Sequence, residues 1–135
     1  MNDLLEKLKL ALKELENDEG DIRLFALFLR EDALGKWDLL VSAPWLDSKK
    51  LTSYDKITEI VQKHLGENDI IQLARIAILD PNDPSVFFLQ EVCPVTNDTY
   101  KEVPIAPLSD RFGFAIRRAF VLRCTALPNP PSDSV

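Results

Sequence analysis

The chain of 135 residues is poor in the residues on which many catalytic motifs depend. Its four glycines are scattered, which excludes a glycine-rich phosphate loop and a dinucleotide-binding fingerprint. One histidine and two distant cysteines are too few for a typical zinc site. A Ser-His-Asp or Cys-His enzyme would have to use His64, which the helical pattern predicts to be a packed or capping residue. We therefore expect no cofactor.

The few cysteines and the lack of long apolar stretches bear on the cellular location of the protein. Cys93 and Cys124 lack metal-type spacing and are too few for a disulfide scaffold, so free thiols in a reducing compartment are expected. The N-terminus is charged from Asp3 onward and has no apolar signal-peptide core. No stretch approaches the ~20 apolar residues that span a membrane. These features predict a cytoplasmic protein without a membrane segment.

The charge is acidic overall but unevenly distributed. Sixteen Lys and Arg stand against 22 Asp and Glu, a net charge of −6. Such a chain has no global field that attracts nucleic acid or anionic lipid, so nucleic acid is disfavoured as a partner. Residues 110–124, however, contain four arginines and one aspartate. This local excess offers a place for a small anion or for an acidic patch on a second copy of the chain.

Apolar periodicity predicts three helices. Residues 4–15 and 57–65 carry apolar side chains at three- and four-residue steps, which indicates two amphipathic helices. Gly20 and Gly66 provide the expected stops. A third, short helix is predicted over residues 84–92, because Asp83 can cap it and a proline stands at its first position.

Other segments have the composition of strands. Residues 22–30 are apolar on both alternating faces, which favours a central strand, and residues 37–43 complete a β-hairpin with them. A further strand is predicted from about Leu73. Residues 100–105 read as a weak edge strand, and 114–124 as a strand with one buried face and a partly basic outer face.

These elements predict a single α+β domain over residues 1–126. The order is α-β-β-α-β-α-β-β, with a mixed sheet of four to five strands covered by helices. Residues 127–135 are rich in Pro and Ser and are predicted to form a disordered tail.

Three carboxylates are candidate metal ligands. Asp38 is acidic within a predicted strand, and Asp80 and Asp83 follow the carboxyl end of another. If they converge, they would suit a metal-dependent, nuclease-like phosphoester hydrolase. The alternative is structural and is favoured: Asp38 would lie on a solvated sheet face or pair with Arg23 or Arg30, while Asp80 and Asp83 would serve a turn and a cap.

The candidate binding residues are cationic or aromatic. Arg111, Arg117 and Arg123 belong to the basic segment, and Arg117 and Arg123 are predicted to share a strand face that could hold a carboxylate or phosphate. Pairing with the chain's own acids is the alternative. Trp45, in a loop beside Pro44, would either close the end of the core or anchor an interface.

With no catalytic constellation in sight, the sequence favours a non-enzymatic interaction or adaptor module that binds a protein partner or itself as a homodimer. The alternatives are the hydrolase that would use the three aspartates and a small-anion sensor that would use the arginine-rich strand.

Overall fold

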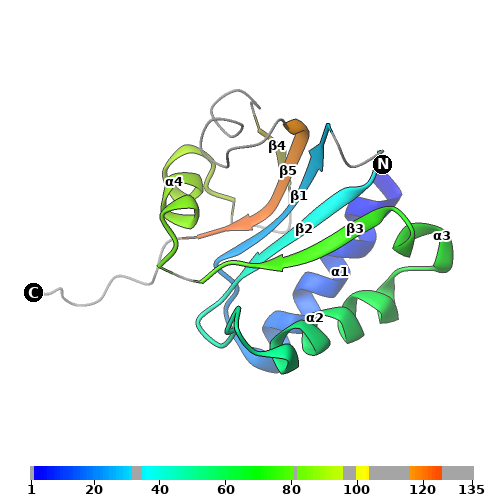
Figure 1. The fold of residues 1–135 in the computed structure, drawn as a ribbon, viewed down its shortest axis with the longest axis horizontal. Coiled ribbons are helices and arrows are strands. Elements are labelled where there is room, and N and C mark those ends of the chain that lie inside the picture. Colours follow the sequence, from blue (N-terminus) through cyan, green and yellow to red (C-terminus); the bar gives the residue numbers. More distant parts are fainter. Residues whose placement is uncertain (1, 32–34, 81, 96–99, 104–115, 126–135) are drawn as a thin grey trace, which may run out of the picture.

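The computed structural model describes residues 2–31, 35–80, 82–95, 100–103 and 116–125. They form a single α+β domain around a five-stranded mixed sheet with the strand order β3-β2-β1-β5-β4 (Figure 1). Neighbouring strands are antiparallel except β2 and β3, which are parallel. The strands are β1 (Leu24–Arg30), β2 (Trp37–Ser42), β3 (Leu73–Ile78), β4 (Lys101–Glu102) and β5 (Ile116–Cys124).

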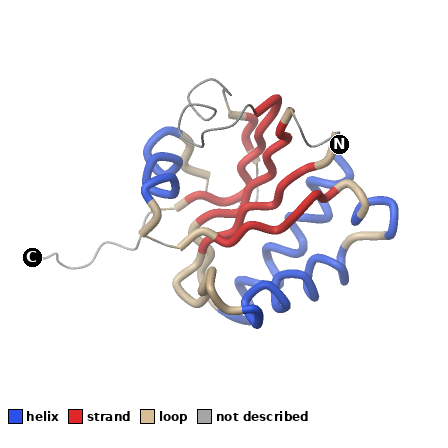
Figure 2. Tube along the Cα trace, in the orientation of Figure 1, coloured by secondary structure: helices blue, strands red, loops and turns tan. Residues whose placement is uncertain are grey.

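Helices cover both faces of this sheet. The helices α1 (Asn2–Glu19) and α2 (Leu51–His64) lie side by side on one face (Figure 2). The helix α4 (Pro84–Val92) lies on the other face, and the one-turn helix α3 (Glu67–Ile70) leads into β3. None of the helices in the described ranges has the length and apolarity needed to cross a lipid bilayer.

The central strand β1 shows why two layers of helix are needed. Phe25, Leu27 and Leu29 pack toward α1 and α2, whereas the alternate residues Leu24 and Phe28 pack toward α4. Burying one such side chain stabilises the fold by about 1.5–3 kcal/mol. The prediction of a central strand with two buried faces is confirmed.

Local signals place most elements correctly. The hairpin, the strand that begins at Leu73 and the helix over 84–92 are all present, and Asp83 caps that helix by accepting a hydrogen bond from the Ser85 N–H at 2.8 Å. The structure adds α3. The strand predicted over residues 100–105 is described only as the two residues of β4, and residues 126–135, including the predicted tail, lie outside the described residues.

The prediction for β5 is wrong in one respect. Its pairing with β1 shifts register twice, so that Arg117 and Leu122 have no opposite residue on β1. Each β-bulge interrupts the simple alternation of faces. Phe120 therefore packs toward α1 and α2, while Cys124 packs toward α4. From Ala119 onward both faces of β5 contribute to the core, and the exposed arginines are confined to Arg117 and Arg118 near its start.

Candidate functional site

Asp38 is buried in an ion-pair cluster with two arginines. Its side chain is 1% exposed, and its Oδ2 lies 2.7 Å from Nε of Arg30 on β1 and 3.2 Å from Nε of Arg75 on β3. The sheet brings the three residues together because β2 lies between the two other strands. The predicted ion pair of Asp38 with Arg30 is thus confirmed, the solvated sheet face is wrong because the side chain is buried, and the contact with Arg75 is an addition. Both guanidiniums contact the same carboxylate oxygen.

Asp80 and Asp83 make local contacts beyond the end of β3. Asp80 Oδ1 accepts a hydrogen bond from the Ser48 hydroxyl at 3.0 Å, which ties this turn to the loop before α2. Asp83 is occupied as the cap of α4. Both side chains have the turn and capping roles that the favoured interpretation gave them.

The three aspartates do not converge. Arg75 is the β3 residue opposite Asp38, and Asp80 follows Arg75 by five residues, or about 16 Å of extended chain. Ions in a two-metal site stand only about 4 Å apart. The described ranges contain no group of three or more His, Cys, Asp or Glu side chains that could hold a metal ion. The geometry gives the hydrolase alternative no support.

The candidate arginines are also separated. Arg111 lies outside the described residues. Arg117 is exposed at a bulge near the start of β5, and Arg123 lies six residues further, at roughly 20 Å of extended chain. The Arg123 Nη2 group lies 2.7 Å from Glu16 Oε1 on α1. Arg117 and Arg123 therefore cannot hold one small anion between them.

Trp45 closes one end of the core beside α1 and α2. Its indole is half-buried against the core, and its Nε1–H donates a hydrogen bond to the Asp21 carbonyl at 3.0 Å. Gly20, whose φ of +119° favours glycine, ends α1 directly beside the ring. A Cβ on Gly20 would stand 3.7 Å from Cδ1 of Trp45. These contacts match the packing interpretation of Trp45.

His64 lies at the interface of α1 and α2. Its Nε2 is 2.8 Å from Glu14 Oε1, and Lys63 donates to the other oxygen of the same carboxylate at 2.9 Å. Hydrogen bonds from Lys63 and His64 lower the pKa of Glu14. The histidine thus joins two helices, as a packed residue would.

An apolar groove of about 320 Å³ runs beside the outer edge of β3. Sequence reasoning missed this site, because the apolar residues of β3 resemble those of an interior strand. Leu73 and Ile76 are only half-buried, Ala74 is exposed, and Ile71, just before the strand, is 63% exposed. The groove lies between α2, the end of α3 and β3, and is lined by Tyr54, Thr58, Val61, Gln62, Ile70, Leu73, Ala74, Arg75 and Ile76.

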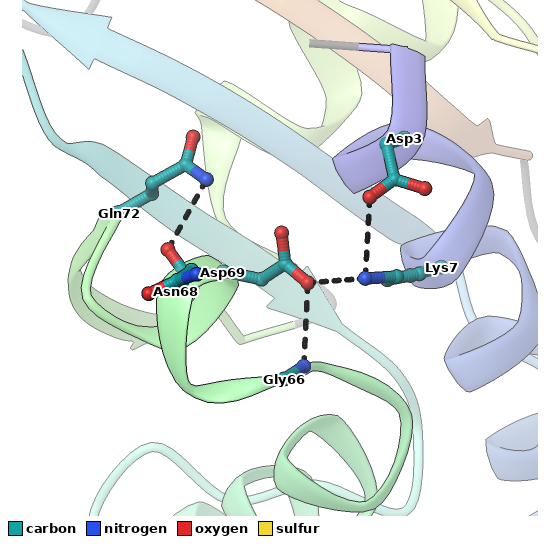
Figure 3. A network of polar contacts seen from close by, with 6 residues as sticks. All are labelled: Asp3, Lys7, Gly66, Asn68, Asp69 and Gln72. Carbon is teal, nitrogen blue, oxygen red and sulfur yellow. Dashed lines mark hydrogen bonds and ion pairs between the residues drawn. The ribbon is translucent and has the colours of Figure 1, made fainter.

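The start of β3 is held in place by α3 and α1 (Figure 3). Lys7 on α1 bridges Asp3 and Asp69, and Asp69 also accepts a hydrogen bond from the Gly66 N–H at 3.3 Å. The contact with Lys7 lowers the pKa of Asp69, and Asp69 in turn raises the pKa of Lys7. These contacts anchor α3 to α1 and position the first residues of the groove.

A second, polar cavity of about 500 Å³ lies where β5 ends and α1 meets the sheet. Two arginines line it: Arg23, which is 7% exposed, and Arg123. Arg23 comes from the residue before β1 and was not among the candidate binding residues. The remaining lining residues are Glu16, Asn17, Asp21, Ile22 and Thr125.

Comparisons of the chain with protein-family models, with curated proteins and with solved structures find no match. The groove beside β3 and the polar cavity are therefore the candidate sites.

Proposed function

We propose that the chain is a non-enzymatic interaction module that binds a protein partner along the outer edge of β3. One observation carries this proposal: β3 stands at the end of the sheet, and no strand pairs with its outer side in the described ranges. The N–H and C=O groups on such an edge form a template for pairing with another chain.

The composition of β3 supports the same function. Folded proteins protect edge strands with lysines, prolines, bulges or very short strands. β3 is six residues long, and its only charge is Arg75. Its pairing with β2 shifts register once, at Ala74. The apolar groove beside this weakly protected edge can take side chains of a bound strand.

A pull-down comparing three forms of the full chain tests the module. Ala74→Lys adds a charge to the exposed edge, whereas Leu10→Lys adds the same charge to an exposed position on α1. A partner should be retained by the wild type and by Leu10→Lys and lost with Ala74→Lys. Retention by all three forms, or by none, contradicts binding along β3.

The homodimer expected from the sequence is one form of this proposal. Two copies of β3 in antiparallel pairing would join two sheets into one. Light scattering over a series of concentrations measures it: a dimer that dissociates in Ala74→Lys and persists in Leu10→Lys supports self-association. A strict monomer at several hundred micromolar contradicts it.

A second candidate function is binding of a small ligand in the polar cavity. The observation that favours it is the presence of both Arg23 and Arg123 in the lining, together with Glu16 and Asp21. Guanidiniums bind carboxylates and phosphates, so an anion or a zwitterion suits this lining. This candidate uses Arg123, as the anion sensor expected from the sequence does, but its second arginine is Arg23 instead of Arg117.

Thermal unfolding with inorganic phosphate or glutamate tests this candidate. A ligand that binds only the native state raises the midpoint of unfolding. The increase should disappear in Arg123→Ala and persist in Arg117→Ala, whose exposed side chain is far from the cavity. Equal increases in both variants, or no increase in the wild type, reject the site.

A further inference from the structure

The edge of β3 has a charge as well as an apolar groove. Arg75 is 52% exposed, although its Nε contacts the buried Asp38. Arg30 lies closer to the same carboxylate oxygen, at 2.7 Å. Arg75 is thus the more distant and the more exposed of the two guanidiniums at this oxygen, and it presents positive charge beside the unpaired edge.

The Arg75 side chain and the apolar residues of the groove lie on opposite faces of the sheet, although Arg75 also belongs to the groove's lining. Trp37 and Leu39, the neighbours of Asp38 on β2, pack toward α1 and α2, so Asp38 and its partner Arg75 point toward the α4 side. The groove is on the α2 side, where Leu73 and Ile76 belong to its lining. Successive residues of a strand added to β3 would therefore meet apolar groove and positive charge in turn.

We propose that the partner bound along β3 is an extended segment of another protein in which apolar residues alternate with acidic ones. This inference rests on the proposed function and specifies its partner. Main-chain hydrogen bonds to β3 would hold the segment, while the groove and Arg75 would select its side chains. A carboxylate of the segment would pair with the exposed part of the Arg75 guanidinium.

A second copy of the chain fits this edge less well. The only charge on β3 is Arg75, so a partner β3 has no carboxylate to place beside it. Charge complementarity thus favours an acidic-apolar segment over self-pairing.

Selection from a phage-displayed library of random dodecapeptides tests the inference with the full chain as bait. The wild type should enrich peptides in which apolar and acidic residues alternate. Arg75→Gln should keep the apolar preference and lose the acidic one, and Arg75→Glu should favour basic residues instead. A synthetic peptide from the wild-type selection should bind Arg75→Gln at least tenfold more weakly. Circular dichroism of each bait establishes that it is folded.

The outcomes separate this inference from the module itself. Wild-type peptides without acidic residues, or the same acidic preference in Arg75→Gln, overturn the inference. Peptides that bind Ala74→Lys as well as wild type place the site elsewhere and overturn both proposals. If no peptide is enriched but a dimer dissociates in Ala74→Lys, the module stands and the acidic-apolar partner is wrong.

Discussion

β3 and β4 stand at the two ends of the same sheet and differ in length, charge and surroundings. β4 has two exposed residues, Lys101 and Glu102, and Glu102 pairs with Arg118 on β5 at 2.9 Å. β3 has six residues, one charge and an apolar groove beside it. A short, charged strand discourages pairing with other chains, whereas a longer apolar one permits it. This difference is why we assign binding to the β3 edge.

The ion pairs near the two edges differ in burial. Asp38 is enclosed by Arg30 and Arg75, whereas Glu102 and Arg118 are each about half exposed, at 50% and 46%. Arg118 also lies 4.9 Å from the centre of the Phe120 ring. Water and salt screen the exposed pair, but removal of the buried Asp38 carboxylate takes away the anion that both guanidiniums contact. Ion pairs of the same residue types should therefore contribute differently to the stability of the fold at the two edges.

The largest expected effect is the loss of the buried carboxylate. Asp38→Asn leaves Arg30 and Arg75 without their shared anion, and it should lower the free energy of unfolding by about 3 kcal/mol. Urea denaturation measures the change. Glu102→Gln is the matched control at the other edge and should change the midpoint little. Equal losses in the two variants would contradict the contrast in burial.

A smaller effect concerns acid stability beside β3. The pKa of Asp69 is lowered by Lys7, so the stability it contributes is present above its unfolded pKa of about 4 and is lost as pH falls through the lower folded pKa. Asp69→Asn should destabilise the protein at pH 7 and should reduce the difference in the free energy of unfolding between pH 7 and pH 3. Urea midpoints at both pH values measure this. A difference as wide as in the wild type would contradict the role of Asp69.

Aggregation on heating should also depend on the β3 edge. Ala74→Lys places a charge on this edge and should raise the temperature at which light scattering begins, because edge pairing is one route to aggregation. Leu10→Lys adds the same charge on α1 and should raise this temperature less. An equal increase would assign the effect to net charge rather than to the strand edge.

The smallest effect is a difference in thiol reactivity with no change in stability. Burial raises the pKa of Cys124 to about 12 and also raises the pKa of Cys93, so neither thiol should react with a disulfide reagent at pH 8 in the folded protein. A cysteine introduced by Ala74→Cys on the exposed edge should react quickly. Both native thiols should react in guanidinium chloride. Rapid labelling of Cys124 in the native state would contradict the burial of its thiol at the end of β5.

Particular residues show where sequence reasoning succeeded and where it failed. Asp83 and Pro84 predicted the start of α4 correctly, because a cap depends on neighbours within one turn. The Arg30 partner of Asp38 was also foreseen, since the two lie on strands of one hairpin. Arg75 was not, because its contact depends on β3 lying parallel to β2. Arg117 and Arg123 were expected to share a strand face that could hold one anion, but six residues of extended strand place them roughly 20 Å apart.

By itself, the sequence determined the elements of this protein. Apolar spacing, caps and glycine or proline breaks act over a few residues, and they specified α1, α2, α4 and the β1–β2 hairpin. The tertiary structure alone decided which strand became an edge, which carboxylate was buried and which arginines lie near one another. Those outcomes depend on contacts between residues far apart in the chain, such as the 37 residues that separate Asp38 from Arg75. The proposed binding edge of β3 belongs to this second group, since an apolar strand becomes a binding surface only when no other strand covers its side.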